Sequence, residues 1–156
     1  MVSVRKTLKL GTLAAVAVAV GVALGTAGSN VASADHHNYE KRNAAMKSMG
    51  SAMKKLGTAV SAGSNTDAAA AAQEIAALAD STPELFAARE MTDKSRAKEE
   101  VWKNMNDFKA KAAATAAAAN KVASDAMGGI LSSDPRAVVG SIGATCSGCH
   151  KVYRAK

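Results

Sequence analysis

The chain has 156 residues and carries 20 Lys and Arg against 13 Asp and Glu, a formal charge of +7 at pH 7. Its length fits a single domain. Aromatic residues make up only 3% of a chain that is 48% hydrophobic, so few large side chains can fill a core. Three basic residues lie in an N-terminal segment that we expect to be removed, which lowers the charge from +7 to +4. The basic character therefore does not indicate nucleic-acid binding.

The N-terminal segment has the pattern of a secretory signal peptide. Basic residues come first, residues 10–24 are apolar, and an A-x-A cleavage site ends at Ala34. An uncleaved membrane anchor is the alternative, but the apolar stretch is shorter than the ~20 residues that a spanning helix needs. We therefore expect residues 1–34 to be cleaved. Residues 35–156 would remain as one periplasmic domain without a membrane segment, with residues 35–38 as a polar tail.

Two long stretches of the remaining chain show helical periodicity. In residues 39–63 and again in residues 95–128, apolar side chains recur in steps of three and four, which places them on one stripe of a helix. Ala, Lys, Met and Glu, which favour helices, are frequent in both stretches. The alanine-rich middle of the second stretch would allow a neighbouring helix to approach closely, so we interpret it as helix rather than as a low-complexity linker.

Two further helices are predicted from capping and proline signals. The polar turn at residues 64–66 can cap a helix that ends before Pro83, and Asp134 followed by Pro135 is typical of a helix start. Residues 81–94 are expected to be irregular, with room for one short helical turn. Four amphipathic helices with short connections predict an all-α protein, an antiparallel four-helix bundle.

The motif Cys146-Ser147-Gly148-Cys149-His150 lies six residues before the end of the chain and has the C-x-x-C-H spacing of a haem c attachment site. Each cysteine sulfur can form a thioether bond with one haem vinyl group, and His150 can bind the iron as the proximal ligand. On a helix the three side chains fall within an arc of about 100°. We therefore predict one covalent haem c, attached at Cys146 and Cys149.

Three other interpretations of this motif are weaker. A structural zinc site needs about four ligands, whereas the other histidines, His36 and His37, are adjacent residues near the opposite end of the chain. A thioredoxin-like redox pair begins a helix beside a βαβ unit, and no strand pattern precedes the motif. A structural disulfide would leave His150 unexplained.

Four side chains elsewhere are candidates for the haem pocket. Arg42 lies on the apolar stripe of the first predicted helix and needs a partner, for which a haem propionate is suitable, although it could also snorkel into solvent. Met46, one turn later, could bind the iron on its distal side, but methionines on such a stripe are often core fillers. Trp102 is expected to wall the pocket or the bundle core, and Tyr153 to flank the porphyrin edge or the propionates.

Taken together, these features resemble the cytochrome c′ family, including its low-spin, methionine-ligated relatives. The resemblance lies in residues 146–154, where an aromatic and a basic residue follow C-x-x-C-H, and in residues 39–46, where an arginine precedes the residue over the iron by four positions. Residues 97–102 and Phe108-Lys109 are similar to the start of the family's third helix. The resemblance implies a four-helix bundle, a homodimer formed through the first two helices, and an exported protein that transfers electrons or binds gases.

Two functions are compatible with the sequence. We favour a one-electron carrier with a protein redox partner, in which His150 and Met46 are the axial ligands of the iron. The alternative is a five-coordinate, high-spin haem that binds nitric oxide or another small diatomic gas, with Met46 only covering the iron. Met49 or Met53 could take the place of Met46 if the helix register differed by a turn. An enzyme such as a peroxidase is not expected, because the sequence marks no distal histidine paired with an arginine.

Overall fold

The structure of the protein is a computed structural model that describes residues 31–156, with side chains described from residue 38 onward. Most of the expected signal peptide, residues 1–34, lies outside the described residues. The described chain forms four long helices, with a 3-10 turn and a short helix between the second and the third. These elements are α1 (Val31–Ser61), α2 (Asn65–Ser81), η1 (Thr82–Phe86), α3 (Glu100–Lys103), α4 (Met105–Met127) and α5 (Pro135–Tyr153).

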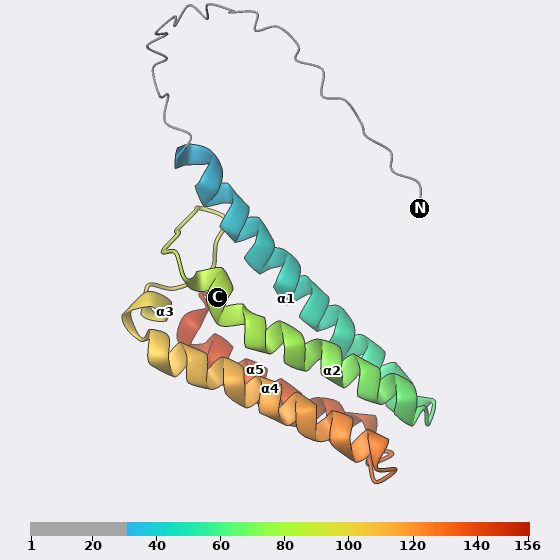
Figure 1. The fold of residues 1–156 in the computed structure, drawn as a ribbon. Coiled ribbons are helices and arrows are strands. Elements are labelled where there is room, and N and C mark those ends of the chain that lie inside the picture. Colours follow the sequence, from blue (N-terminus) through green and yellow to red (C-terminus); the bar gives the residue numbers. More distant parts are fainter. Residues whose placement is uncertain (1–30) are drawn as a thin grey trace, which may run out of the picture.

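The four long helices form the predicted antiparallel bundle, in which each helix runs opposite to the one before it (Figure 1). Helix α2 packs against both α1 and α4, and α5 packs against α4 and α1. The interfaces are rich in buried alanine, and Leu56, Ile75 and Ile142 are among the few large side chains that are fully buried there. Because alanine is small, the helices can approach closely, but this core contains little apolar bulk.

The helix boundaries follow the capping signals in the sequence. Gly63 has a φ of +69° after the end of α1, a conformation that glycine adopts without steric cost. The Ser64 side chain then accepts a hydrogen bond from the first turn of α2. In the turn between α4 and α5, the Asp134 side chain caps the first turn of α5 in the same way, and Pro135 occupies the first helical position. The predicted starts of the second and fourth helices are confirmed.

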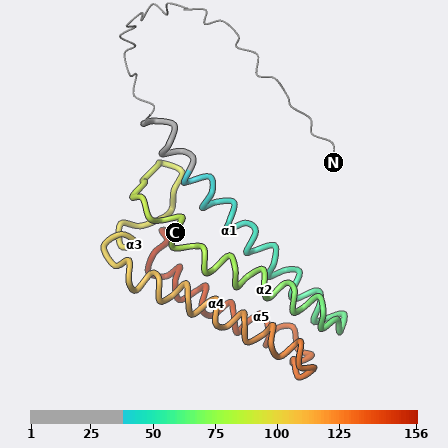
Figure 2. Tube along the Cα trace, viewed as in Figure 1, coloured from blue at the N-terminus to red at the C-terminus, as the bar shows by residue number. Residues whose placement is uncertain are grey.

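The predicted start of the third helix, near residue 95, is wrong. Residues 95–99 are not helical, and Asn104, with φ −125° and ψ 44°, separates α3 from α4. Ala97 instead forms an isolated antiparallel bridge with Arg154, and the Lys98 N–H donates to the Tyr153 carbonyl at 2.9 Å. The trace in Figure 2 places the C-terminus beside this part of the chain. Hydrogen bonds to the C-terminal residues therefore replace those that a continuous helix would have made.

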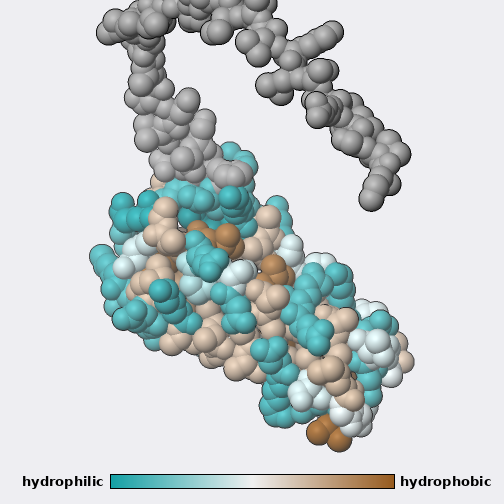
Figure 3. Space-filling model, viewed as in Figure 1, coloured by the Kyte–Doolittle hydropathy of each residue, from teal (hydrophilic) through white to brown (hydrophobic). Residues whose placement is uncertain are grey.

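The N-terminal prediction also needs correction, because residues 35–38 belong to α1 and are not a separate tail. Residues 31–38 contain neither Pro nor Gly, so nothing in them interrupts the helix. No helix within residues 31–156 combines the length and the apolar character needed to cross a membrane. The face in Figure 3 mixes hydrophilic residues (teal) with weakly hydrophobic ones (tan), and few strongly hydrophobic residues (brown) lie on it. Among the described side chains, the large hydrophobic ones that are exposed are Met91, Met127, Ile130 and Val152.

Candidate functional site

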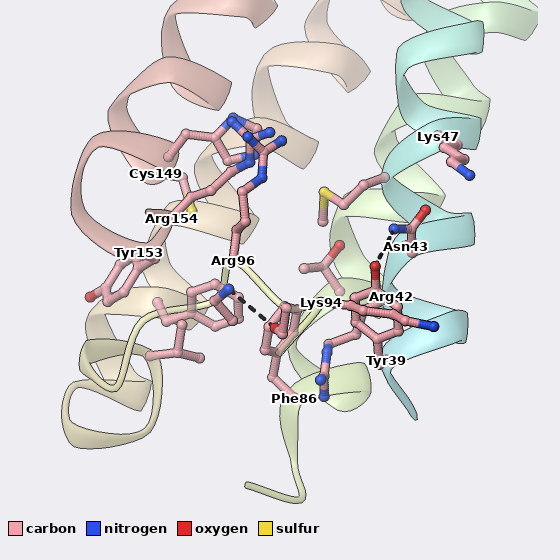
Figure 4. Close-up of a pocket in the computed structure, with 17 residues that line it drawn as sticks. Tyr39, Arg42, Asn43, Lys47, Phe86, Lys94, Arg96, Cys149, Tyr153 and Arg154 are labelled. Atoms are coloured by element: carbon pink, nitrogen blue, oxygen red, sulfur yellow. Dashed lines mark hydrogen bonds between the residues drawn. The ribbon is translucent and has the colours of Figure 1, made fainter. Parts of the chain in front are cut away.

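A pocket of about 370 Å³ opens at the end of the bundle where α1, η1 and α5 meet the irregular segment formed by residues 87–99. We call residues 87–99 the strap. In Figure 4, α1 forms one wall of this pocket, while Cys149, Tyr153 and Arg154 of α5 and its C-terminal extension lie on the other side. The packing of the bundle thus brings residues 39–47 of α1 and residues 149–154 at the end of the chain to one site, as the predicted antiparallel arrangement requires.

The two cysteines of the C-x-x-C-H motif are both free thiols and both partly buried on α5. Cys149 lines the pocket together with His150. Cys146, one turn earlier, packs against the alanine-rich core and is not among the lining residues. Burial raises the pKa of both thiols, and for Cys149 the charge of Lys111 acts in the opposite direction. Both sulfurs are therefore held as neutral thiols beside the pocket.

His150, one residue after Cys149, lines the pocket and is exposed. Desolvation, and then the nearby positive charge of Arg96, lower the pKa of its imidazole. Both effects favour the neutral ring, which is the form whose nitrogen lone pair can bind a metal.

Arg42 lies on the α1 wall of the pocket and is only 4% exposed, which rules out the alternative that its side chain snorkels into solvent. Its Nη1 lies 3.5 Å from Oε2 of Glu90, and its Nη2 donates to the Glu90 carbonyl at 3.2 Å. The guanidinium carbon lies 5.0 Å from the centre of the Phe86 ring. Burial lowers the pKa of Arg42, and the charge of Glu90 opposes that shift. The predicted contact with a haem propionate stays a prediction.

Sequence reasoning missed Glu90. The residue lies in the strap, where no periodicity marks which side chains turn inward, and one acidic residue among several in a polar stretch carries no signal. A partner for the buried Arg42 was expected, but the sequence offered no means of choosing it.

Met46 lines the pocket from α1 and is partly exposed. Met49 and Met53, on the same helix, pack instead against the alanine-rich core. Of these three methionines, only Met46 therefore lies at the site.

Of the two aromatic residues predicted at the site, Tyr153 lines the pocket and Trp102 does not. Tyr153 lines the pocket, is buried, packs edge-to-face on Phe108, and donates its hydroxyl hydrogen bond to the Asp107 carboxylate. Burial, followed by the interactions with Asp107, raises the pKa of Tyr153 to about 12. Trp102 is not among the lining residues; its indole N–H donates to the Phe86 carbonyl at 2.9 Å. Trp102 thus supports the wall of the pocket from behind.

The rim of the pocket is positively charged. Lys47, Lys94, Arg96 and Arg154 line it, and no Asp or Glu does so. None of these four takes part in the ion pairs found within residues 38–156. Such a rim suits an apolar molecule that carries acidic groups at its edge.

The donor set in and beside the pocket fits haem c better than a bare metal ion. Across the described residues, no group of three or more His, Cys, Asp or Glu side chains is close enough to hold a metal ion. A metal with only His150 as a protein ligand needs further ligands of its own, which a porphyrin supplies. The two thiols can form the covalent links, and the basic rim can hold the propionates.

Comparison with known proteins points to one family. A family model described as Cytochrome C' matches residues 37–154. A cytochrome c' from Pararhodospirillum photometricum is 36% identical over 91 residues, which cover 58% of this chain and 72% of that relative.

Solved structures give the same family. Cytochrome c' from Thermochromatium tepidum is 31% identical, with a TM-score of 0.62 over 76% of this chain and 95% of the other. A nitric oxide complex of an isoleucine-for-leucine mutant of cytochrome c prime from Alcaligenes xylosoxidans is 25% identical, with a TM-score of 0.65 over 78% of this chain and 97% of the other.

Proposed function

The chain belongs to the cytochrome c′ family, and we propose that it is an exported haem protein whose iron stays five-coordinate and binds nitric oxide. The family is one of haem-binding proteins rather than of classical enzymes, and its members carry covalent haem c. The observation that carries the proposal is the similarity to structures solved as nitric oxide complexes of cytochrome c prime. The gas-binding interpretation therefore replaces the electron carrier that we favoured from sequence.

Within this proposal, three residues of the C-x-x-C-H motif hold the cofactor. When bound, haem supplies an iron atom that can bind a diatomic gas and exchange one electron. Cys146 and Cys149 provide the two thioether links, which the presence of two free thiols one helical turn apart supports. His150 provides the proximal ligand, which the preference for its neutral form supports.

Arg42, Arg96 and Arg154 are proposed to hold the propionates. A guanidinium has five N–H donors, and Arg42 directs two of its nitrogens to Glu90, so N–H groups remain for another acidic partner. Arg96 and Arg154 lie in the rim of the pocket without a carboxylate partner among the ion pairs of residues 38–156. Tyr153 packs at the same end and completes the wall.

Met46 is proposed to cover the distal side without binding the iron. It lines the pocket from α1, the helix whose Asn43 and Lys47 lie across the pocket from Cys149 of α5 in Figure 4. Its unbranched thioether side chain is flexible and partly exposed, so it can move aside for a small gas molecule. Because Met46 lines the pocket, a second candidate function is also compatible with the site. In that function the protein is a one-electron carrier, Met46 and His150 both bind the iron, and the redox partner is another protein.

We further propose periplasmic export after cleavage of residues 1–34, and a homodimer formed through α1 and α2. Small residues on α1 would let a second copy approach closely, but two of them, Ala52 and Ala59, are 0% and 6% exposed because they are buried within the bundle itself, so they do not offer a face to a second copy. The outer face of α1 carries other small residues that are exposed, such as Ser48 and Ser51.

The proposed function is tested by the optical spectrum of the purified haem protein before and after nitric oxide is added. We expect a high-spin spectrum and a complex with nitric oxide. A low-spin spectrum with a methionine-to-iron charge-transfer band would instead support the electron carrier.

A further inference from the structure

We propose that Glu90 is a positioning residue for the haem site, which holds Arg42 in the pocket wall and fastens the strap, residues 87–99, to α1. The inference rests on the proposed function only in that the pocket receives haem; it does not depend on which gas binds there. Glu90 itself is not among the residues that line the pocket, so it would act through Arg42 and through the strap.

The first observation is that Glu90 is buried and that its carboxylate and carbonyl oxygens are engaged by α1. Its side chain is 2% exposed and that of Arg42 is 4% exposed. Oε2 pairs with the guanidinium of Arg42, Oε1 accepts the backbone N–H of Tyr39 at 3.3 Å, and the Glu90 carbonyl accepts a second bond from Arg42. One residue of the strap is thus bound to two residues of α1 that line the pocket.

The second observation is that the other end of the strap is bound to the opposite wall. Ala97 bridges to Arg154, and the Ala155 N–H donates to the Arg96 carbonyl at 2.8 Å. Lys94 lies between these two attachments and Arg96 belongs to the second one; both line the pocket, and Figure 4 shows both beside it. The strap therefore crosses from α1 to the end of α5, and Glu90 is its attachment on the α1 side.

The third observation is a contrast with another ion pair of the same segment. Arg89 and Glu99 also pair, but their side chains are 59% and 38% exposed, and water can replace either partner. Removing the charge of Glu90 would leave the buried guanidinium of Arg42 without the carboxylate that pairs with it inside the protein, so that only the proposed propionate would balance its charge, which is more costly than the loss of an exposed pair. We expect the local opening of the strap, and the orientation of Arg42, to depend on Glu90 and not on Glu99.

The test compares Glu90→Gln with Glu99→Gln in the complete, haem-loaded protein. Both changes keep the size of the side chain and remove one negative charge from the same segment. Trypsin cleavage after Lys94 and Arg96, followed by mass spectrometry, measures how often the strap opens. We expect cleavage at least about tenfold faster in Glu90→Gln, because a broken buried pair lowers the cost of opening. In Glu99→Gln we expect the trypsin cleavage rate to stay within about twofold of the wild-type rate.

The reduction potential of the haem is the second measurement, because a purely structural residue would not change it. Loss of a buried negative charge near the cofactor favours the reduced state, so we expect an upward shift in Glu90→Gln and none in Glu99→Gln. Equal cleavage rates in the two variants would overturn the inference. Faster cleavage with an unchanged potential would overturn it as well, since Glu90 would then hold the strap without influencing the haem site.

A double variant covers the case in which Glu90→Gln does not fold. Arg42→Gln combined with Glu90→Gln removes both members of the buried pair, so neither side chain is left charged without the other. We expect it to accumulate as haem protein and to resist trypsin better than Glu90→Gln alone, and a double variant no better than the single one would contradict the inference. None of these measurements requires nitric oxide, so a failure of gas binding would not be confused with a failure of this proposal.

Discussion

Cys146 and Cys149 lie one turn apart on α5 but contact different apolar clusters. Cys146 packs against the large, alanine-rich cluster that fills most of the bundle. Cys149 packs against a small cluster of buried side chains built from Phe86, Val101, Phe108 and Tyr153. The motif therefore lies where the two clusters meet, and a haem bonded to both sulfurs would connect them.

The first prediction concerns the covalent links. Changing both Cys146 and Cys149 to Ser should abolish covalent haem, because a serine hydroxyl does not form the thioether bond. Intact-mass measurement of the wild-type protein should show one haem on a chain that begins at Asp35. Ser147→Ala, an exposed change within the same motif, is the matched control and should keep its haem. Haem that stays bound to the double serine variant through acid extraction would contradict this prediction.

The second prediction is that haem and the bundle depend on each other for stability. The core has many alanines and few large side chains, so loss of a large buried group should cost several kcal/mol, about 3–5 by analogy with deletion of an aromatic side chain. The protein with Cys146→Ala and Cys149→Ala, prepared without haem, should therefore melt about 10 °C lower or more, with a broader transition. Circular dichroism during heating measures this. A haem-free protein that melts as high and as sharply as the haem protein would refute the prediction.

The third prediction concerns Tyr153 at alkaline pH. Burial and Asp107 raise the pKa of Tyr153 from an ordinary value of 10.0 to about 12, so the folded state favours the neutral phenol. This contribution to stability is fully present below pH 10 and is lost as the pH rises towards 12. The free energy of unfolding, measured with urea at a series of pH values, should fall over this range.

Tyr153→Phe should lower stability at neutral pH, because the hydrogen bond to Asp107 is lost, but it should remove most of the decline above pH 10. Tyr39→Phe, at a half-buried position on α1, is the control and should keep the decline. If Tyr153→Phe declined as steeply as the wild type, another group would have to be responsible.

The bundle could be predicted from sequence because its helices are long and carry local signals at their ends. Ser64 and Asp134 mark the starts of α2 and α5, and the spacing of apolar residues marks the buried faces. The start of the third helix could not be predicted in the same way. Its residues favour a helix, but their backbone bonds to residues 153–155, about 55 positions away in sequence, hold them in another conformation.

The residues of the candidate site could be predicted where they belong to a sequence motif or to a periodic helix. They could not be predicted where they lie in a segment without regular secondary structure. The spacing of Cys146, Cys149 and His150 is specific, and Met46 and Tyr153 follow from helical periodicity. Glu90 has no such pattern, since the strap has no repeating geometry. Trp102 was expected to wall either the pocket or the bundle core, and the sequence offered no means of choosing between a lining position and the supporting position it occupies.

The fourth prediction is the homodimer. Sedimentation at tens of micromolar, an order-of-magnitude working range, should give twice the mass of the chain. Ser51→Arg places a large charge on the exposed outer face of α1 and should shift the protein towards monomer. Ser124→Arg, at an exposed position on α4, is the control and should leave the dimer intact. A wild-type protein that sediments as a monomer in this range would refute the prediction.

The fifth prediction concerns Met46, whose role separates the two candidate functions. If Met46 only covers the pocket, Met46→Ala should bind nitric oxide about tenfold faster or more while the spin state of the iron stays unchanged. Met49→Ala is the matched control, because Met49 packs against the bundle core and does not line the pocket. Met49→Ala should lower the free energy of unfolding by about 2 kcal/mol, the low end of the range for a buried methionine, because Met49 is only partly buried. It should leave the rate of nitric oxide association close to that of the wild type.

The optical spectrum of the wild-type haem protein, recorded oxidised and reduced and then with nitric oxide, tests the central claim most directly. An iron bound by His150 with an open distal position predicts high-spin spectra in both oxidation states and a new spectrum when nitric oxide is added. A low-spin oxidised spectrum with a methionine-to-iron charge-transfer band, lost in Met46→Ala, would contradict this account and assign the protein to electron transfer.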